Sequence, residues 1–463
     1  MCVHAMTLEA HDPWPLIHPV AIAADDPEHP ALADKSTTAA AYTTIGREVE
    51  FWFTVSKGMW LLHASNLETL DPYGGDPIRS LVEVICAHRG LVLLRLHTPH
   101  RNFPTDYFVY GYNTCGRKGP WVDKLPEIEP LIRSTSSIGL LRRTNHYVVA
   151  NLLQELNPKT GQLEMFLDCY SSKNNKWSRR QGTLISPDGK EECLWGWQTD
   201  RVIPFNKTLL WVDLSRGILL CRSLLDDSSS HAKFHVVPHP SGLLLPDDGL
   251  RWEHPQPFWS VGCSKGKVKL VSLRSLQGAD AGAEVLTWVL DLDQLEWREE
   301  PSTSLNYTRL RADMKSKLQR QNSLPPFDQD NSPCYPVMST DQRDILYLTV
   351  AAQNMAWLLR IDMHTLDDKH ICTLEDIANY PRFCEHLNPP YPSDLPKYLN
   401  NRSEGDRQLR RPPRRSKRKL SKQPEGEVRY SLQDSRVLLK FLRERPRVVI
   451  LLIVFILQLP TVT

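Results

Sequence analysis

The sequence lacks the residue spacings that most directly reveal a metal site or a phosphate-binding enzyme. Its 10 cysteines are scattered, and no two stand in the C-x-x-C spacing that clamps zinc or exchanges thiols. A G-x-x-x-x-G-K-[ST] phosphate loop is also absent. The histidine pair His97 and His100 and the pair His235 and His239 have no predicted helix to align them, since Pro238 interrupts the second pair. We therefore expect no metal ion and no cofactor.

A secretory signal is missing as well, because no basic segment followed by an apolar stretch stands at the N-terminus. A reducing compartment, cytoplasmic or nuclear, follows as the default expectation. Several cysteines, such as Cys86 and Cys221, stand inside apolar runs. We expect them to be small buried side chains.

Proline and tryptophan are abundant, with 35 and 13 copies in 463 residues. Many prolines force turns, and many tryptophans supply large rings that pack between layers. Short apolar runs at 50–55, 90–96, 107–110 and 146–153 are rich in β-branched or aromatic residues and are bounded by turn residues. This texture predicts a mainly β protein built from short strands.

The composition divides the chain into four predicted parts. Residues 1–44 form a disordered N-terminal segment, 45–400 a β-rich domain, 401–447 a basic and mostly disordered tail, and 448–463 an apolar tail. The length alone would also permit two or three domains.

A weak internal repeat suggests how the β domain is built. Four apolar runs end in an aspartate, and two of them are followed by a polar turn and a tryptophan; these positions are Asp168, Asp213, Asp291, Asp362, Trp177 and Trp297. Propeller blades of about 40 to 50 residues often show this pattern. We predict a propeller-like or multi-sheet antiparallel body, with an open β-sandwich or an α+β arrangement as the alternative.

The segment 210–221 resembles the grass-expanded plant family called domain of unknown function 1618. Supporting pieces follow in the expected order at 106–110, 121–126, 138–143, 147–150, 266–271 and 390–399. The resemblance spans about 45–400 and implies a β-rich fold, a plant origin and no established enzymatic activity. Ser215 stands where the family usually has Trp, and Arg222 where it usually has Asp. Some relatives carry an N-terminal F-box, but the first 45 residues lack the amphipathic helices of such a module.

The residues of this segment also have a physical interpretation of their own. Trp211, Asp213 and Arg216 surround a predicted chain reversal, Gly217 can adopt a positive φ there, and Cys221 ends the returning strand. We expect Asp213 to accept hydrogen bonds from turn amides or to pair with Arg216. A structural role is the leading interpretation, and a ligand-binding role is the alternative.

One motif raises the question of catalysis. Gly262, Ser264 and Gly266 match G-x-S-x-G, the nucleophile elbow of α/β-hydrolases. That elbow requires a helix after the serine, whereas 267–273 alternates like a strand. We predict a two-stranded hairpin that turns at Ser264, with a serine hydrolase acting through Ser264 as the alternative.

Positive charge is concentrated near the C-terminus. Residues 401–447 hold 16 Lys and Arg against 6 Asp and Glu, so a net charge of +2 leaves about −8 on the rest. The densest cluster is a candidate nuclear-import address; it comprises Arg410, Arg411, Arg414, Arg415, Lys417, Arg418 and Lys419. A solvated tail, or a contact with nucleic acid or acidic membrane, are the alternatives. Without aromatic residues between the charges, the cluster offers no stacking platform for single strands.

The apolar run at 448–459 is short for a membrane span. As a helix it would extend about 18 Å, against a hydrocarbon core of about 30 Å. A C-terminal membrane anchor is the alternative to an atypical end of the gene. Taken together, the sequence predicts a non-catalytic protein-interaction module with an unidentified protein partner, and a tail-directed nucleic-acid-associated protein is a second hypothesis.

Overall fold

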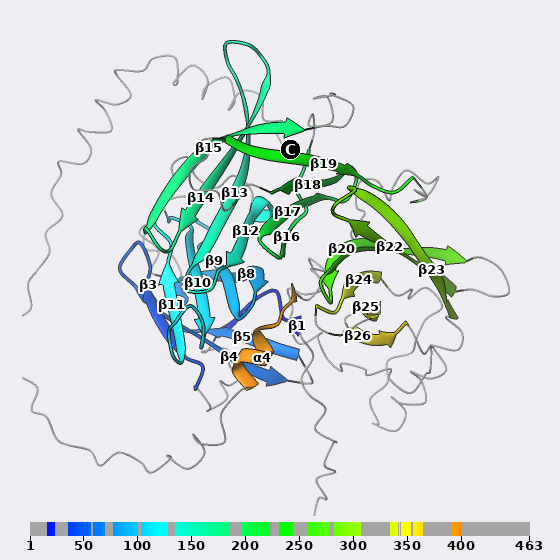
Figure 1. Ribbon diagram of the computed structural model, residues 1–463. Helices are drawn as coiled ribbons and strands as arrows, with labels where there is room; N and C mark the ends of the chain where they lie inside the picture. The colour runs from blue at the N-terminus through cyan, green and yellow to red at the C-terminus, as the bar shows by residue number, and fades with distance from the viewer. Residues whose placement is uncertain are drawn as a thin grey trace, which may run out of the picture. The chain divides into compact units, whose positions relative to one another are not determined.

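The computed structural model describes most of the region between residues 16 and 400 (Figure 1). The described residues are 16–23, 36–56, 59–69, 77–100, 103–127, 135–185, 197–222, 224, 231–241, 243, 258–276, 282–306, 334–340, 342, 344–352, 355–363 and 391–400. The predicted tails, 401–447 and 448–463, lie outside them. Among the described residues, no helix combines the length and the apolarity needed to cross a bilayer.

The described residues form six groups of strands that follow one another in sequence, which we call blades 1 to 6. Blade 1 holds β1 (Leu16–Ile17), β2 (Ile22–Ala23), β3 (Ala39–Tyr42), β4 (Glu48–Ser56), β5 (Met59–Ala64) and β27 (Tyr391–Pro392). Blade 2 holds β8 (Leu81–His88), β9 (Leu91–His97), β10 (Asp106–Tyr112) and β11 (Pro120–Lys124). A separate pair, β6 (Glu68–Thr69) and β7 (Ile78–Arg79), lies between them in the sequence.

The central part of the chain forms two further blades. Blade 3 follows a short 3-10 helix, η1 (Thr135–Ser137), and holds β12 (Ile138–Arg142), β13 (Tyr147–Leu156), β14 (Leu163–Ser171) and β15 (Lys176–Ile185). Blade 4 holds β16 (Arg201–Phe205), β17 (Thr208–Asp213), β18 (Gly217–Cys221) and β19 (His231–Pro238). Because β15 and β19 pair in parallel, and β12 also contacts β16, these eight strands form one nearly closed, barrel-like sheet.

The last two blades are antiparallel meanders, and one short helix follows them. Blade 5 holds β20 (Trp259–Ser264), β21 (Lys267–Leu276), β22 (Gly282–Asp291) and β23 (Glu296–Asn306). Blade 6 holds β24 (Cys334–Met338), β25 (Ile345–Ala352) and β26 (Met355–Asp362). The helix is α4 (Leu395–Asn400), and its Leu395 and Leu399 are buried against blades 1 and 2.

Successive blades pack face to face through apolar clusters. Blades 1 and 2 meet where the rings of Phe51 and Phe108 lie 5.2 Å apart. A second cluster joins blades 2 and 3, a third joins blades 3 and 4, and a fourth joins blades 4 and 5. Fully buried side chains of this kind supply most of the stabilisation of such a body.

The ring of contacts closes through blade 6. Ser264 of blade 5 donates to the carbonyl oxygen of Gln342 at 3.3 Å, and blade 6 packs on blade 1 where Tyr347 and Leu61 share a cluster. Each blade therefore contacts the next, and the sixth contacts the first. The prediction of a mainly β, propeller-like or multi-sheet antiparallel fold is confirmed.

The domain begins earlier than predicted. We expected disorder over 1–44, but Leu16 and Ile17 of β1 are fully buried, and β1 pairs with β27 and with β5. β2 and β3 also lie inside this range. The prediction failed because β1 and β2 are only two residues long, and one of the two strands that pair with β1 is β27, at the far end of the domain.

The predicted repeat is right at three of its four aspartates. Asp168, Asp291 and Asp362 lie on the third strands of blades 3, 5 and 6, whereas Asp213 ends the second strand of blade 4. The spacing from Asp168 to Asp213 is therefore not the length of one blade.

The two tryptophans of the repeat are equivalent. Trp177 and Trp297 lie on the fourth strands of their blades, and their indole N–H groups donate to the carbonyl oxygens of Pro126 and Pro238 at 3.0 and 2.9 Å. Each proline follows or ends the outermost strand of the preceding blade. The repeat thus joins neighbouring blades at their outer edges.

Candidate functional site

Hairpin turns from several blades lie together at one end of the domain. In an antiparallel meander, the turn between the first two strands and the turn between the last two lie at the same end. Turns of blades 2 and 3 line one hollow, turns of blades 2, 4 and 5 line another, and Lys265 N donates to Thr340 O of blade 6 at 3.3 Å. We call this end the hairpin face; it comprises residues 89–90, 113–119, 143–146, 172–175, 206–207, 265–266 and 292–295.

Basic side chains dominate the hairpin face. These seven turns carry one acidic residue, Asp293, and seven basic ones, which are Arg89, Arg117, Lys118, Arg143, Lys173, Lys207 and Lys265. The neighbouring β24–β25 turn adds Asp344, whose carboxylate is paired with Lys269 at 3.1 Å. All seven basic residues are exposed except Arg143, which is half-buried. Arg117 pairs with Asp123 at 2.7 Å, and its guanidinium lies 4.3 Å from the Trp121 ring centroid. Among the described residues, the other six have no carboxylate within ion-pair distance.

Two hollows concentrate this charge. The first, of about 460 Å³, is lined by Arg117, Arg143 and Lys173 of blades 2 and 3. The second, of about 520 Å³, is lined by Arg89, Lys207 and the neighbouring Arg222, together with Asp293. Three basic side chains in each hollow create a local positive potential, although the domain carries a negative net charge.

The turn geometry holds the basic residues outward. Arg89 and Lys265 adopt φ values of 48° and 46°, and the glycines after them, Gly90 and Gly266, have φ of 78° and 75°. Two consecutive positive φ values define the type I′ turn, which matches the twist of a hairpin. Gly90 is further required because a Cβ atom there would lie 2.7 Å from the ring of Tyr398. The backbone therefore fixes where these two cations emerge.

A histidine lies directly behind this surface. His88 Nδ1 is 2.9 Å from the backbone N–H of Arg142, which donates to it. Burial, and then the positive charges of Arg89 and Arg142, lower the pKa of His88 to about 3. The imidazole is consequently neutral at physiological pH and adds no charge to the hairpin face.

The predicted family-motif residues come together at the β17–β18 reversal. The Asp213 carboxylate is buried and accepts hydrogen bonds from the backbone N–H groups of Gln198 and Ser215, at 2.8 and 2.9 Å. Arg216 Nε lies 3.6 Å from the same carboxylate. Both expected interactions of Asp213 are present, so the described contacts agree with a structural role.

The remaining motif residues tie this reversal to its surroundings. Trp211 is fully buried, and its indole N–H donates to Ser137 O of blade 3 at 2.8 Å. Gly217 has a φ of 148°, and a Cβ atom there would lie 2.3 Å from Val237 O of the neighbouring strand. Cys221 is fully buried. Of the two departures from the family, Ser215 bonds Asp213 through its hydroxyl, and Arg222 donates to Leu292 O of blade 5.

The G-x-S-x-G motif lies in a hairpin, as predicted. Ser264 ends β20 and pairs with Lys267 of β21, and the turn is formed by Lys265 and Gly266. The Ser264 side chain is buried at 2% exposure, and its hydroxyl donates to Gln342 O. A strand, not a helix, follows the serine.

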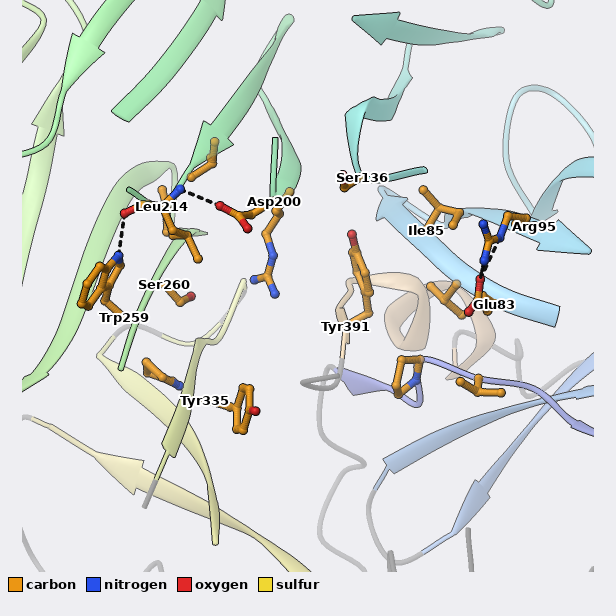
Figure 2. Close-up of a pocket in the computed structure, with 17 residues that line it drawn as sticks. Glu83, Ile85, Arg95, Ser136, Asp200, Leu214, Trp259, Ser260, Tyr335 and Tyr391 are labelled. Carbon is orange, nitrogen blue, oxygen red and sulfur yellow. Dashed lines mark hydrogen bonds and ion pairs between the residues drawn. The ribbon is translucent and has the colours of Figure 1, made fainter. Parts of the chain in front are cut away.

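A cavity of about 250 Å³ lies among the inner strands, and its lining comes from blades 1, 2, 4, 5 and 6 and from η1 (Figure 2). Its charged side chains are Glu83, Arg95, Asp200 and Arg201. The remaining lining residues are Pro19, Val20, Val84, Ile85, Ser136, Val212, Leu214, Trp259, Ser260, Val261, Tyr335, Pro336 and Tyr391. The sequence does not reveal this cavity, because the lining residues are scattered from 19 to 391 and share no motif.

The histidines, cysteines and basic cluster considered in the sequence analysis complete the set of predicted sites. Among the described residues, His, Cys, Asp and Glu form no group of three or more that could hold a metal ion. His239 instead contacts Asp213 O at 3.0 Å, and burial raises the pKa of the Cys86 and Cys263 thiols to about 12. The predicted import cluster, residues 410–419, lies outside the described residues.

Among the described residues, the fold is an arrangement of six β blades with a small cavity among their inner strands. Residues 211–347 match the family described as "Protein of unknown function (DUF1618)". The family predicted from the sequence is confirmed over this segment, which runs from β17 of blade 4 to β25 of blade 6. No curated protein matches the chain.

Two solved structures show weak likenesses. One comes from a structural and mechanistic analysis of two prolyl endopeptidases, with 15% identity and a TM-score of 0.30; the match covers 71% of this chain and 40% of that chain. The other is MPT-1, a GDP-Man-dependent mannosyltransferase from Leishmania mexicana, with 9% identity, a TM-score of 0.20, and coverage of 64% and 89%. The chain thus spans 40% of the length of the endopeptidase, and neither likeness bears on function.

Proposed function

We propose that this protein is a non-catalytic interaction module whose hairpin face binds an acidic segment of a partner protein. The observation that carries the proposal is the excess of seven basic residues over one acidic residue in the turns of that face. Six of the seven have no carboxylate partner among the described residues. Arginine and lysine without partners attract carboxylates over a range of about 10 Å at moderate salt.

The shape of the face supports a protein partner. Each hollow offers three cations at one point, which suits the carboxylates of individual Asp or Glu side chains. A long nucleic acid would instead need a continuous basic track, and Asp293 interrupts the second hollow. The net charge of about −8 outside residues 401–447 also disfavours nonspecific attraction of polyanions.

The proposal is tested by measuring, with fluorescence anisotropy at low and moderate salt, how tightly the protein binds a labelled ten-residue glutamate peptide. The double variant Arg89→Ser, Lys207→Ser removes two cations from one hollow. We expect it to bind the peptide about tenfold more weakly, because each exposed charge contact contributes only a modest free energy. The matched control is Lys159→Ser with Arg216→Ser, two exposed residues in turns of the other type. Equal loss in both variants, or tighter binding of duplex DNA than of peptide, would contradict the proposal.

The non-catalytic part of the proposal is supported by the surroundings of Ser264, whose hydroxyl is buried and donates to a carbonyl oxygen. We expect Ser264→Ala to leave the rate of p-nitrophenyl acetate hydrolysis unchanged from that of the native protein. A rate that falls to background in this variant would restore the serine hydrolase hypothesis.

Nuclear import through residues 410–419 and a plant source, which the family resemblance implies, belong to the same proposal. The density of seven basic residues in ten supports the import role. A reporter fused to residues 401–447 should concentrate in nuclei, and a diffuse signal would remove the import role without affecting the hairpin face.

A further inference from the structure

The central cavity holds a cation that has no carboxylate partner among the described residues. Arg201 begins β16 and is half-buried. Among the described residues, no carboxylate lies within ion-pair distance of its guanidinium. The guanidinium carbon lies over the ring of Tyr391, 5.9 Å from its centroid. A partly buried cation without a counter-charge is costly, so the site favours an anion that enters it.

The other charges of the cavity are already engaged. Glu83 and Arg95 form an ion pair across β8 and β9, with Arg95 Nε donating to the carboxylate at 2.7 Å. Asp200 accepts a hydrogen bond from Leu214 N at 2.7 Å (Figure 2). Leu214 in turn accepts a hydrogen bond from the indole N–H of Trp259 at 2.8 Å. Arg201 is therefore the cation available to a ligand.

Hydroxyl groups and aromatic rings complete the lining. Tyr391, Tyr335 and Ser260 all line the cavity, and Figure 2 shows the Tyr391 ring directed into it. Tyr335 adopts a φ of 53° within an irregular stretch of the β24–β25 ladder. Positive φ values are uncommon for aromatic residues, and such backbone strain is concentrated at binding sites.

We propose that this cavity binds a small organic acid, with its carboxylate on Arg201 and its apolar body against Tyr391, Trp259 and the valine side chains. Arginine presents a planar fork of donors that matches a carboxylate. A phosphate ester is disfavoured, because Glu83 and Asp200 also face the cavity and would repel a second negative charge. The volume of about 250 Å³ lies below the roughly 300–1,000 Å³ of pockets for drug-sized ligands, which limits the acid to a small one.

This inference is independent of the hairpin face, because no residue of the cavity belongs to that surface. Either site can fail its test without consequence for the other.

Titration calorimetry at pH 7 tests the cavity with three acids, acetate, benzoate and phenylacetate, and with benzamide and phenylacetamide as uncharged counterparts. We expect the aromatic acids to bind more tightly than acetate, and each amide to bind at least about tenfold more weakly than its acid. Arg201→Gln should weaken phenylacetate at least about tenfold, as expected for a hydrogen bond to a charged group.

Three further variants separate binding from folding. Arg201→Lys keeps the positive charge and should retain part of the affinity for phenylacetate. Tyr391→Phe removes only the hydroxyl group and should weaken the affinity for phenylacetate a few-fold. Arg216→Gln, an exposed arginine outside the cavity, should bind phenylacetate like the native protein. The proposal is overturned if none of the three acids binds below about 10 mM, if acids and amides bind equally, or if a folded Arg201→Gln protein binds like the native one.

Discussion

Positive charge is paired with carboxylates at the interface between blades 5 and 6, whereas at the hairpin face it is mostly unpaired. At the interface, Lys269 is 5% exposed, and its Nζ lies 2.6 Å from Glu300 and 3.1 Å from Asp344. Lys265, four residues earlier on the hairpin face, is exposed and has no carboxylate within ion-pair distance among the described residues. Charge inside the framework is paired because burial demands it. Under the proposed function, the unpaired cations mark the surface that the partner would contact.

The buried strands of the blades should lose the most stability on substitution. Replacing a tryptophan on an inner strand and one on an outer strand tests this expectation. Trp211→Ala removes a fully buried ring together with its hydrogen bond to Ser137 O, so we expect a loss of about 4 kcal/mol in the free energy of unfolding. Trp297→Ala, on an outer strand and partly exposed, should cost about 1–2 kcal/mol. Urea denaturation distinguishes the two, and equal losses would show that the inner strands have no special weight.

Replacing the buried Lys269 tests whether the paired charge between blades 5 and 6 stabilises the fold. Lys269→Met leaves Glu300 and Asp344 without their shared partner, and we expect a loss of about 3 kcal/mol in the free energy of unfolding. Lys267→Met, at an exposed position of the same strand, is the matched control and should change stability by less than about 0.5 kcal/mol. A neutral Lys269→Met protein would mean that the paired charge is not part of the framework.

The pH dependence of stability tests the neutral histidine behind the hairpin face. The pKa of His88 is lowered from 6.5 to about 3 in the folded protein, so the unfolded state binds the proton first as pH falls. The contribution of His88 is complete above pH 6.5 and is lost as pH falls from 6.5 toward 3, by at most about 1.4 kcal/mol per pH unit.

Substitution of His88 isolates this contribution. In His88→Asn, the amide oxygen can still accept the Arg142 N–H, and we expect a flatter curve of stability against pH between 6.5 and 4 than in the native protein. His231→Asn, at an exposed position, should reproduce the native slope. Parallel curves for all three proteins would contradict the assignment.

The smallest effect on folding is expected at the hairpin face. Lys207→Ser and Lys265→Ser remove exposed cations without carboxylate partners, so each should change the free energy of unfolding by less than about 0.5 kcal/mol. Thermal denaturation at low and high salt provides the measurement. A loss of about 2 kcal/mol in either variant would assign that lysine to the framework and weaken its role in binding.

Local patterns in the sequence predicted local structure well. The alternation over 267–273 indicated a strand, and the hairpin at Ser264 follows from it. The reversal at Asp213 and Gly217 was also predicted, because an aspartate that accepts turn amides and a glycine with positive φ are decided by neighbouring residues. The association of Trp177 and Trp297 with a repeated turn was visible for the same reason.

Features assembled from distant segments could not be predicted. β1 is two residues long, and its burial depends on Tyr391 and Pro392. Asp213 resembled the other repeat aspartates, although its run is a second strand. Arg201 and Tyr391 meet only because the fold brings β16 of blade 4 close to β27 of blade 1. The hairpin face was likewise hidden, since its seven basic residues are spread over six turns and the net charge outside residues 401–447 is negative.

Lysine labelling followed by mass spectrometry tests most directly whether the hairpin face is the open, partner-binding surface. With an amine-reactive ester, Lys173, Lys207 and Lys265 should react fast and Lys269 slowly, and the ten-residue glutamate peptide should slow the first three while Lys159 keeps its rate. Equal protection of Lys159, or no protection at the hairpin face under conditions where the peptide binds, would contradict the account.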